Sequence, residues 1–439
     1  MRRSRTSCGR CLVRLRRFAG LVCLLLPVVS VAGNLKIKPT TTITAQTSNN
    51  TSTADSFQSQ SNGNLGAGNV SKLDTRALLY PGATTKVYAH LMLWFGQNNH
   101  MNVGYSSIDP VQVKRQINDM VSRGIDGVII DWYGPGTFVD QASLLVMQEA
   151  EAHPGFNFAI MVDKGAIQND PCPGCTPQQT LEEQLKYVEQ TYFPSPAYMT
   201  VEGQPVVTNF DIDLHYDIDW QAAKDSMASD PVFLFQNNSG FSHVISDGSY
   251  SWVMPQTNDY GMAYLSSFYA TGVSFPSEQT VGAAYKGFND TLAAWGSGRI
   301  MSQQCGQTWL DTFAKVNSLY GPDNPLDSMQ VVTWNDYEEG TEIESGIDNC
   351  LSLDASVSGN ALQWSLSGDE SGVSLYKVFI SKDGQHLMKI AQVPAGQHAM
   401  NMCSFPLAAR AYTLYVKAIG KPSLANHTSA AVSYTPACP

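Results

Sequence analysis

Eight short apolar segments alternate with helical patterns between residues 87 and 333, and this alternation constrains the fold more than any other feature of the sequence. Each segment has the length of a strand, and its nearly continuous apolar character is typical of strands buried on both faces of a parallel sheet. The repeated order of strand and helix predicts an α/β fold, a (β/α)₈ TIM barrel. The predicted strands are Val87–Leu93, Gly127–Asp131, Asn157–Val162, Pro205–Phe210, Pro231–Gln236, Tyr250–Met254, Val281–Tyr285 and Met329–Thr333.

Capping signals mark several of the intervening helices. The clearest helix begins at Asp109-Pro110, where a capping side chain precedes a proline at the first helical position, and it stops at Gly124. A second helix begins at Thr176-Pro177, and Ala222–Ala228 and Thr308–Leu319 are further candidates. A doubly wound open sheet is the alternative fold, but no GxGxxG segment follows the first strand, which disfavours it.

The last predicted strand runs into a polar cluster, VVTWNDYEEGTEIE, from Val331 to Glu344. Active sites of barrels lie at the carboxyl ends of the strands, so this loop is the first candidate for a functional site. Asp336 and Glu339 are three positions apart, and a turn can direct both into one cavity. Two carboxyls in one pocket beside an aromatic wall can have their pKa values pushed apart. One then holds a proton while the other is ionised, as cleavage of a glycosidic bond requires.

Two other interpretations of this loop stay open. A run of charged residues is commonly a solvated loop without a ligand, and several carboxylates on one loop also suit a calcium ion. The Asp- and Gly-rich pattern of calcium loops is absent, and the histidines show neither HxH nor HExxH spacing. We therefore predict no metal ion and no cofactor.

Polar and aromatic residues follow most of the other predicted strands as well. If the fold is a barrel, these residues converge on one mouth, where aromatic faces beside carboxylates and amides suit the C–H faces and hydroxyls of sugars. Each residue alone is more commonly a helix cap or a loop residue, so the prediction depends on the set. The candidate substrate-binding residues are Trp94, Asp131, Trp132, Tyr133, Asp163, Asn209, Asp211, Gln236, Trp334, Asn335 and Tyr337.

The acidic cluster resembles two families of glycoside hydrolases. TWNDY, followed by Glu339, is similar to the TWNDYGES signature of family 71, which includes α-1,3-glucanases. EEGTEIE is similar to the NEWHEGTQIE segment of family 99, the endo-α-mannosidases and mannanases. The resemblance implies that Asp336 and Glu339 are the catalytic pair. The chain differs from family 71 at Glu338 and Gly340, and from family 99 at Asp336, where Glu is usual.

The resemblance extends toward the N-terminal part of the predicted barrel. Gly104 to Gly136, which ends in DWYGPG, is similar to the second βα segment of family 99, and His90 to Gly96 stands where these families have their first strand. Asp163 stands at the third-strand position where they carry an acidic residue. The resemblance implies that the sugar subsites are lined by Trp94, Asp131, Trp132, Tyr133 and Asp163.

The N-terminal part of the sequence predicts export. Residues 1–32 combine seven arginines with an apolar run that ends in Ser30-Val31-Ala32, as in a secretory signal peptide, and an uncleaved anchor is the alternative. Residues 33–77 are rich in Ser, Thr and Asn and predict a disordered linker. Loss of the seven arginines would take the formal net charge from −11 to −18, which disfavours binding of nucleic acid or of an anionic membrane.

Six cysteines remain after the predicted signal peptide, and an even number in an exported protein favours disulfides. A CxxC pair is also found in redox and zinc sites, but no second CxxC completes a zinc site. The predicted pairs are Cys172 with Cys175, Cys305 with Cys350 and Cys403 with Cys438.

Residues 350–439 have a different sequence pattern from the predicted barrel at residues 78–349. Short alternating strands with turns between them resemble a fibronectin type III-like β-sandwich. Tyr412, Leu414, Val416 and Ala418 would share its inward face, with Trp364 on an early strand. Such a domain would act as a spacer, stabilise the barrel or bind carbohydrate.

Together these features predict a secreted or periplasmic monomeric glycoside hydrolase that acts on a polysaccharide or oligosaccharide. By resemblance to family 71 the substrate is an α-linked glucan cut in endo fashion, with Glu339 as general acid and Asp336 as base. If the chemistry resembles that of family 99, Asp336 instead assists through the sugar 2-hydroxyl and the substrate is a mannoside. The same residues could also belong to a non-catalytic glycan-binding protein or to a metal-dependent hydrolase.

Overall fold

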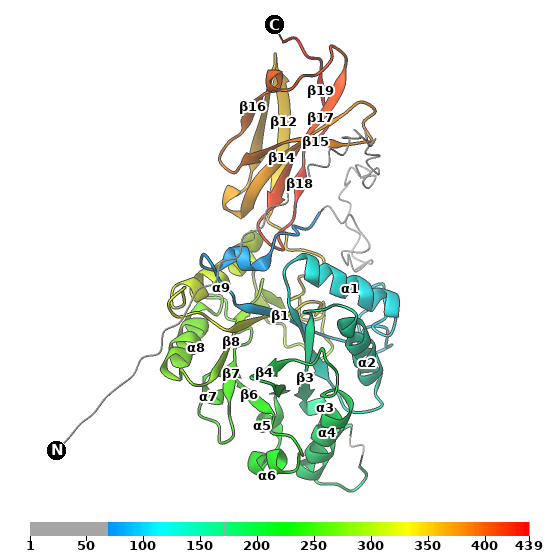
Figure 1. Cartoon of the computed structure of the whole chain (residues 1–439), viewed down its shortest axis with the longest axis vertical. Coiled ribbons are helices and arrows are strands. Elements are labelled where there is room, and N and C mark those ends of the chain that lie inside the picture. Colours follow the sequence, from blue (N-terminus) through cyan, green and yellow to red (C-terminus); the bar gives the residue numbers. More distant parts are fainter. Residues whose placement is uncertain (1–68, 170–171, 439) are drawn as a thin grey trace, which may run out of the picture. The chain divides into compact units, whose positions relative to one another are not determined.

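In a computed structural model, which describes residues 69–169 and 172–438, eight parallel strands close into a barrel (Figure 1). The strand order is β3-β2-β1-β11-β8-β7-β6-β5, and pairing of β3 with β5 closes the ring. This confirms the predicted TIM barrel, and every predicted strand overlaps a strand of the ring. The strands are β1 Lys86–Leu91, β2 Gly127–Trp132, β3 Asn157–Asp163, β5 Gln204–Phe210, β6 Val232–Gln236, β7 Gly248–Tyr250, β8 Gln279–Ala284 and β11 Ser328–Val331.

The helices cover the outside of this ring (Figure 1). Asp109 caps α1 by accepting a hydrogen bond from the backbone N–H of Val111 at 2.9 Å, and the other three predicted helices correspond to α4, α6 and α9. Several helices have only one turn, too short to give a periodic pattern in the sequence. The helices are α1 Pro110–Ser122, α2 Phe138–Glu151, α3 Lys164–Gln168, α4 Pro177–Thr191, α5 Ile212–His215, α6 Trp220–Asp225, α7 Asn237–Gly240, α8 Met262–Ser274 and α9 Gln307–Asn317.

The strand register determines which carboxyls face the barrel axis. Trp132 packs against Tyr187 and Tyr192 of the surrounding helices, so it points outward. Successive side chains of a strand point to opposite faces, so Asp131 points inward. Asp131 is paired with Met161 in β3, two residues before Asp163, and Asp163 therefore points to the same side.

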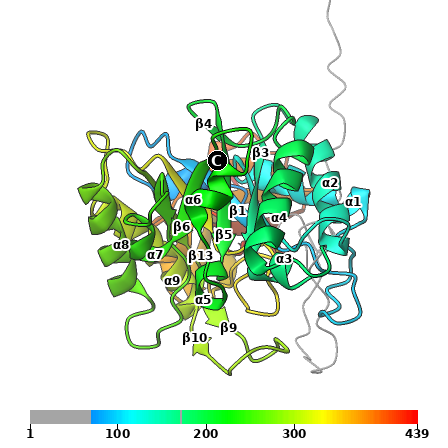
Figure 2. The ribbon, with the colours of Figure 1, turned by 90° about the horizontal axis from the view of Figure 1, so that it is seen from below.

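A hairpin is inserted between β8 and α9. It consists of β9 (Phe288–Asn289) and β10 (Ile300–Met301). Figure 2 shows this hairpin and α5 at one end of the barrel and β4 (Thr200–Val201) at the other. Because β9–β10 and α5 each follow the carboxyl end of a strand, they mark the end of the barrel that we call the mouth.

The chain beyond residue 350 forms two antiparallel sheets whose apolar faces share one core. Tyr412, Leu414, Val416 and Ala418 are all buried in that core together with Trp364, as predicted. The fibronectin type III assignment and the domain boundaries stay predictions. The first sheet contains β12 Ser352–Ser358, β13 Ala361–Ser367 and β16 Ala399–Asn401. The second contains β14 Val373–Ser381, β15 Met388–Pro394, β17 Tyr412–Gly420, β18 His427–Thr428 and β19 Val432–Tyr434.

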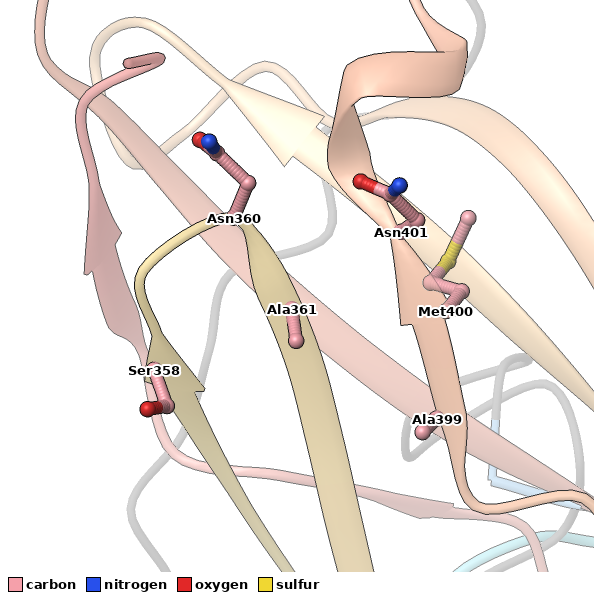
Figure 3. Close-up of a pocket in the computed structure, with 6 residues that line it drawn as sticks. All are labelled: Ser358, Asn360, Ala361, Ala399, Met400 and Asn401. Atoms are coloured by element: carbon pink, nitrogen blue, oxygen red, sulfur yellow. The ribbon is translucent and has the colours of Figure 1, made fainter. Parts of the chain in front are cut away.

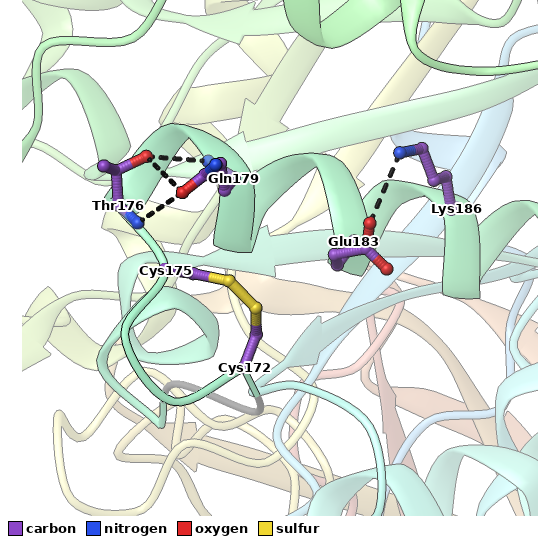
Figure 4. Close-up of a disulfide and its surroundings, with 6 residues drawn as sticks. All are labelled: Cys172, Cys175, Thr176, Gln179, Glu183 and Lys186. Atoms are coloured by element: carbon purple, nitrogen blue, oxygen red, sulfur yellow. Dashed lines mark hydrogen bonds and ion pairs between the residues drawn. A yellow bond between two sulfur atoms is a disulfide. The ribbon is translucent and has the colours of Figure 1, made fainter.

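Three disulfides join the cysteine pairs that the sequence predicts. Figure 4 shows the Cys172–Cys175 disulfide directly before α4, where Thr176 and Gln179 form a capping box. Three disulfides fit an extracellular protein.

The predicted signal peptide and most of the predicted linker lie outside the described residues. Within the linker range, Val70 and Thr75 are buried and Thr75–Leu78 forms a 3₁₀ helix, so the folded part begins before residue 77. Within the described part of the chain, none of the helices combines the length and the apolar character that crossing a bilayer requires.

Candidate active site

The loop that follows β11, residues 333–344, lies at the mouth and is fixed by hydrogen bonds at its start. We call it the acidic loop. The backbone N–H of Trp334 donates to the carbonyl of His90 at 2.8 Å. The side chain of Asn335 accepts from the N–H of Met92 at 2.9 Å and donates to the carbonyl of the same residue at 2.8 Å. The loop is thus attached to the segment that follows β1.

Asp336 organises the turn that brings the predicted catalytic pair together. Its side chain is almost fully buried, and its Oδ1 accepts from the backbone N–H groups of Glu338 at 3.0 Å and Glu339 at 2.8 Å. The N–H of Asp336 donates to Thr333 Oγ1 at 2.8 Å. Glu339 is only partly buried, and its carbonyl accepts from Asn289 of the β9–β10 hairpin at 2.7 Å. The three-residue spacing therefore gives one turn, with Asp336 inside it and Glu339 at its more open side.

Two further carboxyls, Asp131 and Asp163, point to the barrel axis at the ends of β2 and β3. Both side chains are 4% exposed. Asp163 Oδ1 accepts from the N–H of Gly165 at 2.6 Å and so caps α3. Asp131 receives a hydrogen bond from Tyr133, but its Oδ1 has no hydrogen-bond partner. A buried carboxyl oxygen without a partner costs free energy, so Asp131 is suited to accept a hydrogen bond from a ligand.

Burial raises the pKa of each of these carboxyls, and repulsion from other carboxyls of the cluster adds to the shift at Asp131 and Asp336. Burial and the charge of Glu339 raise the pKa of Asp336 well above its usual range. The pKa of Asp131 is also raised well above its usual range, first by burial and then by the charges of Asp163, Asp336 and Glu339. Burial raises the pKa of Asp163 to about 7. Burial also raises the pKa of Glu339, although Arg299 and a hydrogen bond from Trp295 oppose this. The cluster therefore binds protons at a pH at which exposed carboxyls are ionised.

Aromatic side chains gather beside the carboxyls. The rings of Trp94 and His100 are stacked with centroids 4.9 Å apart, and Tyr133 and Trp295 lie edge-on to Trp94 at 6.1 and 5.8 Å. His100 Nδ1 lies 3.0 Å from Glu338 Oε2, which fixes this aromatic cluster to the acidic loop. The indole N–H of Trp94 is buried and has no hydrogen-bond partner.

Three other predicted residues follow β5 and β6. Asp211 accepts a hydrogen bond from Lys164 Nζ at 3.2 Å, and its charge raises the pKa of Asp163. Asn209 is buried, and its amide nitrogen has no hydrogen-bond partner. Gln236 is half-buried at the carboxyl end of β6.

Four of the predicted substrate-binding residues have fully or almost fully buried side chains that support the site from beneath. The indole of Trp132 donates to Asp140 at 2.9 Å, and the guanidinium of Arg123 lies over the ring of Trp334 at 4.9 Å. Tyr337 donates to Glu344 at 2.9 Å, and the amide of Asn335 is hydrogen-bonded to the backbone N–H and carbonyl of Met92. These four side chains are therefore not among the residues that we propose to contact a sugar.

Three residues that the sequence analysis did not select join the site: His100, Trp295 and Arg299. They come from loops whose fold over the mouth no local pattern predicts. One signal was present for Trp295, which precedes two glycines in the turn-like segment WGSG. Trp295 is 50% exposed, so part of this side chain is open to solvent beside the aromatic cluster.

No family model and no curated protein matches this chain. Among solved structures it is similar to a GH99 endo-α-mannosidase from Bacteroides thetaiotaomicron, with 17% identity over 60% of this chain and 87% of that one, at a TM-score of 0.48. A structure described as a glycoside hydrolase-like protein shows 15% identity over 60% of this chain and 87% of that one, at a TM-score of 0.46. Likenesses this distant carry no functional argument.

No group of three or more His, Cys, Asp or Glu side chains is arranged to hold a metal ion within residues 69–169 and 172–438. The four carboxyls of the mouth can act as acids, as bases and as hydrogen-bond partners of a ligand.

A shallow hollow lies on the C-terminal sheets, between the β12–β13 turn and β16 (Figure 3). The two asparagines that line it already have hydrogen-bond partners: Asn360 bonds to Tyr434 and Ala437, and Asn401 accepts from the N–H of Cys403. The residues that line it include no aromatic side chain on which a sugar ring could stack.

Proposed function

We propose that this protein is a glycoside hydrolase that cleaves an α-linked polysaccharide at the mouth of its barrel. The observation that supports this proposal is a group of four carboxyls, the buried Asp131, Asp163 and Asp336 and the partly buried Glu339, beside the aromatic cluster. Each carboxyl comes from the carboxyl end of a different strand or from the acidic loop. Paired carboxyls of unequal environment beside aromatic rings are what hydrolysis of a glycoside requires.

Glu339 would act as general acid and Asp336 as general base. Glu339 gives its proton to the glycosidic oxygen as the bond from that oxygen to the anomeric carbon breaks. Asp336 takes a proton from a water molecule whose oxygen bonds to the anomeric carbon, so that the configuration inverts. The more open position of Glu339 suits the acid, because the leaving sugar must depart on the solvent side.

Burial raises the pKa of both members of the pair, and Asp336 is the more deeply buried of the two. Two features favour an ionised Asp336 when Glu339 holds the proton. The charge of Glu339 is one cause of the raised pKa of Asp336, so a proton on Glu339 removes it. The two backbone N–H groups at Asp336 Oδ1 also favour its ionised form.

By resemblance of the TWNDY motif the substrate is an α-1,3-linked glucan. The EEGTEIE and WYGPG motifs favour an α-mannoside as the second candidate, with Asp336 assisting through the sugar 2-hydroxyl and with retention of configuration. The test is reducing-end release from α-1,3-glucan, α-1,4-glucan and α-mannan by the wild-type protein and by Glu339→Gln.

We expect release from one polymer and a loss of about 10²-fold or more in Glu339→Gln, the usual effect of removing a general acid. Lys86→Gln, an exposed change on the outside of β1, is the matched control and keeps activity. Retention of one polymer in a pull-down without any release would overturn the catalytic proposal in favour of a glycan-binding protein.

A further inference from the structure

The β9–β10 hairpin presents one large aromatic side chain to the mouth and is built to keep it there. Asp290 is fully buried and accepts hydrogen bonds from the N–H groups of Ser297 at 3.1 Å and Arg299 at 2.6 Å, and from Arg299 Nε at 2.8 Å. The guanidinium of Arg299 also lies over Phe288 at 4.8 Å. A Cβ at Gly296 would lie 1.8 Å from the carbonyl oxygen of Asp290, so only glycine fits this turn.

Trp295 stands on this turn and has two kinds of contact. Its ring lies edge-on to Trp94 at 5.8 Å and to His100 at 5.9 Å. Its side chain lies near enough to Glu339 to oppose the rise in the pKa of that carboxyl, and the same hairpin donates the N–H of Asn289 to the carbonyl of Glu339 at 2.7 Å. At the same time half of the residue, 50%, is exposed. Trp295 is therefore the member of the aromatic cluster that combines contact with Glu339 and an open face.

The position of Glu339 defines on which side of the scissile bond this face lies. A general acid protonates the glycosidic oxygen, and that oxygen departs with the leaving sugar. An open aromatic face in contact with the acid therefore lies where the leaving sugar is bound, whereas Asp131 and Asp163, deeper on the barrel axis, lie where the sugar that is attacked is bound.

We propose that Trp295 is the stacking platform for the leaving-group sugar and that its indole N–H positions the carboxyl of Glu339. This inference rests on the proposed function, since it assigns a role relative to the general acid. Sugars present flat C–H faces that pack on aromatic rings. An indole N–H that donates to one oxygen of the Glu339 carboxyl orients the other oxygen, which carries the proton, toward the glycosidic oxygen.

The two roles are separated by two substitutions, Trp295→Phe and Trp295→Ala. Phenylalanine keeps an aromatic face but lacks the N–H, and alanine removes both. Leu292→Ala is the matched control, because Leu292 lies on the same hairpin and is 57% exposed. The substrates are α-1,3-linked gluco-oligosaccharides of four to six units and α-glucosyl fluoride, whose leaving group carries no sugar; the corresponding mannosides replace them if mannan is the polymer cut.

We expect Trp295→Ala to lower kcat/KM about tenfold on the oligosaccharides, the scale of one aromatic contact, and to leave kcat/KM on the fluoride unchanged. Both Trp295 variants should shift the alkaline limb of the pH profile to higher pH, since loss of the N–H raises the pKa of Glu339. Leu292→Ala should do neither. Equal losses on oligosaccharide and fluoride would overturn the platform, and an unmoved alkaline limb in Trp295→Phe would overturn the positioning role.

A binding measurement distinguishes failure of this inference from failure of the proposed function. The same oligosaccharides are titrated against wild type, Trp295→Ala and Leu292→Ala, with the quenching of tryptophan fluorescence and isothermal titration as readouts. Binding that Trp295→Ala alone loses, in a protein that hydrolyses nothing, would support sugar stacking on Trp295 but overturn the hydrolase and with it the leaving-group assignment. Binding that Trp295→Ala retains would overturn the platform whether or not the protein is an enzyme.

Discussion

At the scale of single residues, the three-residue spacing of Asp336 and Glu339 places both side chains on one turn of the acidic loop. Asp336 holds the turn through two backbone N–H groups, and the same turn carries Glu339 toward the open side of the mouth. Its neighbour Glu338 is turned away from this pair and bonded to His100 and to the N–H of Met101. One run of acidic residues thus divides into the proposed catalytic pair and a carboxylate that holds the loop.

The pH dependence of activity follows from the raised pKa values of this pair. The base must be ionised, so a raised pKa of Asp336 moves the acid limb to higher pH. The acid must be protonated, so a raised pKa of Glu339 moves the alkaline limb to higher pH as well. We expect an optimum well above the pKa values of about 4 that exposed carboxyls have. Initial rates across pH 3 to 9, on the order of one unit per step, check this; an optimum near pH 4 would contradict it.

Glu344 should affect how the stability of the protein, and not its reaction rate, depends on pH. It is 1% exposed and accepts hydrogen bonds from Tyr105 at 3.0 Å and Tyr337 at 2.9 Å, and burial raises its pKa from 4.5 to about 7. A folded pKa above the unfolded one means that the contribution to stability is present below pH 4.5 and is lost as the pH rises through about 7.

Glu344→Gln removes this titration while keeping one oxygen that can accept from Tyr105 and Tyr337; the bonds from Gln112 and Gln116 to the other oxygen are lost at every pH. We expect the unfolding free energy of the wild type to fall between pH 4.5 and 7 more steeply than that of the variant, by up to about 1.4 kcal/mol per pH unit. Urea unfolding at several pH values measures both slopes. Parallel slopes would show that Glu344 does not titrate in this range.

At the scale of elements, α4 and the β9–β10 hairpin have different tasks. The capping box of Thr176 and Gln179 starts α4 on the outside of the barrel (Figure 4). Thr176→Ala removes the side-chain oxygen that accepts from the N–H of Gln179, and should lower the unfolding free energy by about 1 kcal/mol with activity unchanged. Thermal unfolding and initial rates on the same preparation test both parts, and a large loss of activity would argue against a purely structural role.

A substitution in the β9–β10 hairpin should lower activity and leave stability nearly unchanged, the reverse of Thr176→Ala. Gly296→Ala places a Cβ against the carbonyl of Asp290, so the turn must shift and Trp295 with it. We expect reduced cleavage of polymer and nearly unchanged thermal stability, because the hairpin tip is exposed. Gly321→Ala is the control, since an added Cβ there meets no atom within 4 Å. Equal activity of the two variants would contradict a fixed position for Trp295.

At the scale of the whole molecule, two disulfides differ in the length of chain they close. Cys305–Cys350 closes 45 residues, including the whole acidic loop, whereas Cys172–Cys175 closes three. Chain entropy gives about 4 kcal/mol for the longer loop and about 2 kcal/mol for the shorter. Replacing each pair with serines should therefore lower the melting temperature more for Cys305 and Cys350. The reverse order in calorimetry would show that local strain outweighs the loop entropy.

The sequence by itself determined the barrel and the position of the acidic loop, whereas the pairing of the cysteines was decided by the structure. Barrel strands have to be short and apolar because they are buried on both faces, and this pattern is local. Alternation along a strand could also have shown that Asp131 and Trp132 point to opposite sides, so that both cannot line one mouth. The spacing of Asp336 and Glu339 fits within one turn and needs no tertiary information.

Only the tertiary structure decided which aromatic side chains meet these carboxyls. Trp94 and Trp295 lie far apart in the chain and are brought together because β1 and β8 flank β11 in the closed ring. Trp334 stands beside Asp336 in the sequence, yet it is covered by Arg123 at the end of α1. Contacts between distant loops depend on strand order and on loop packing, and neither leaves a periodic signal in the sequence.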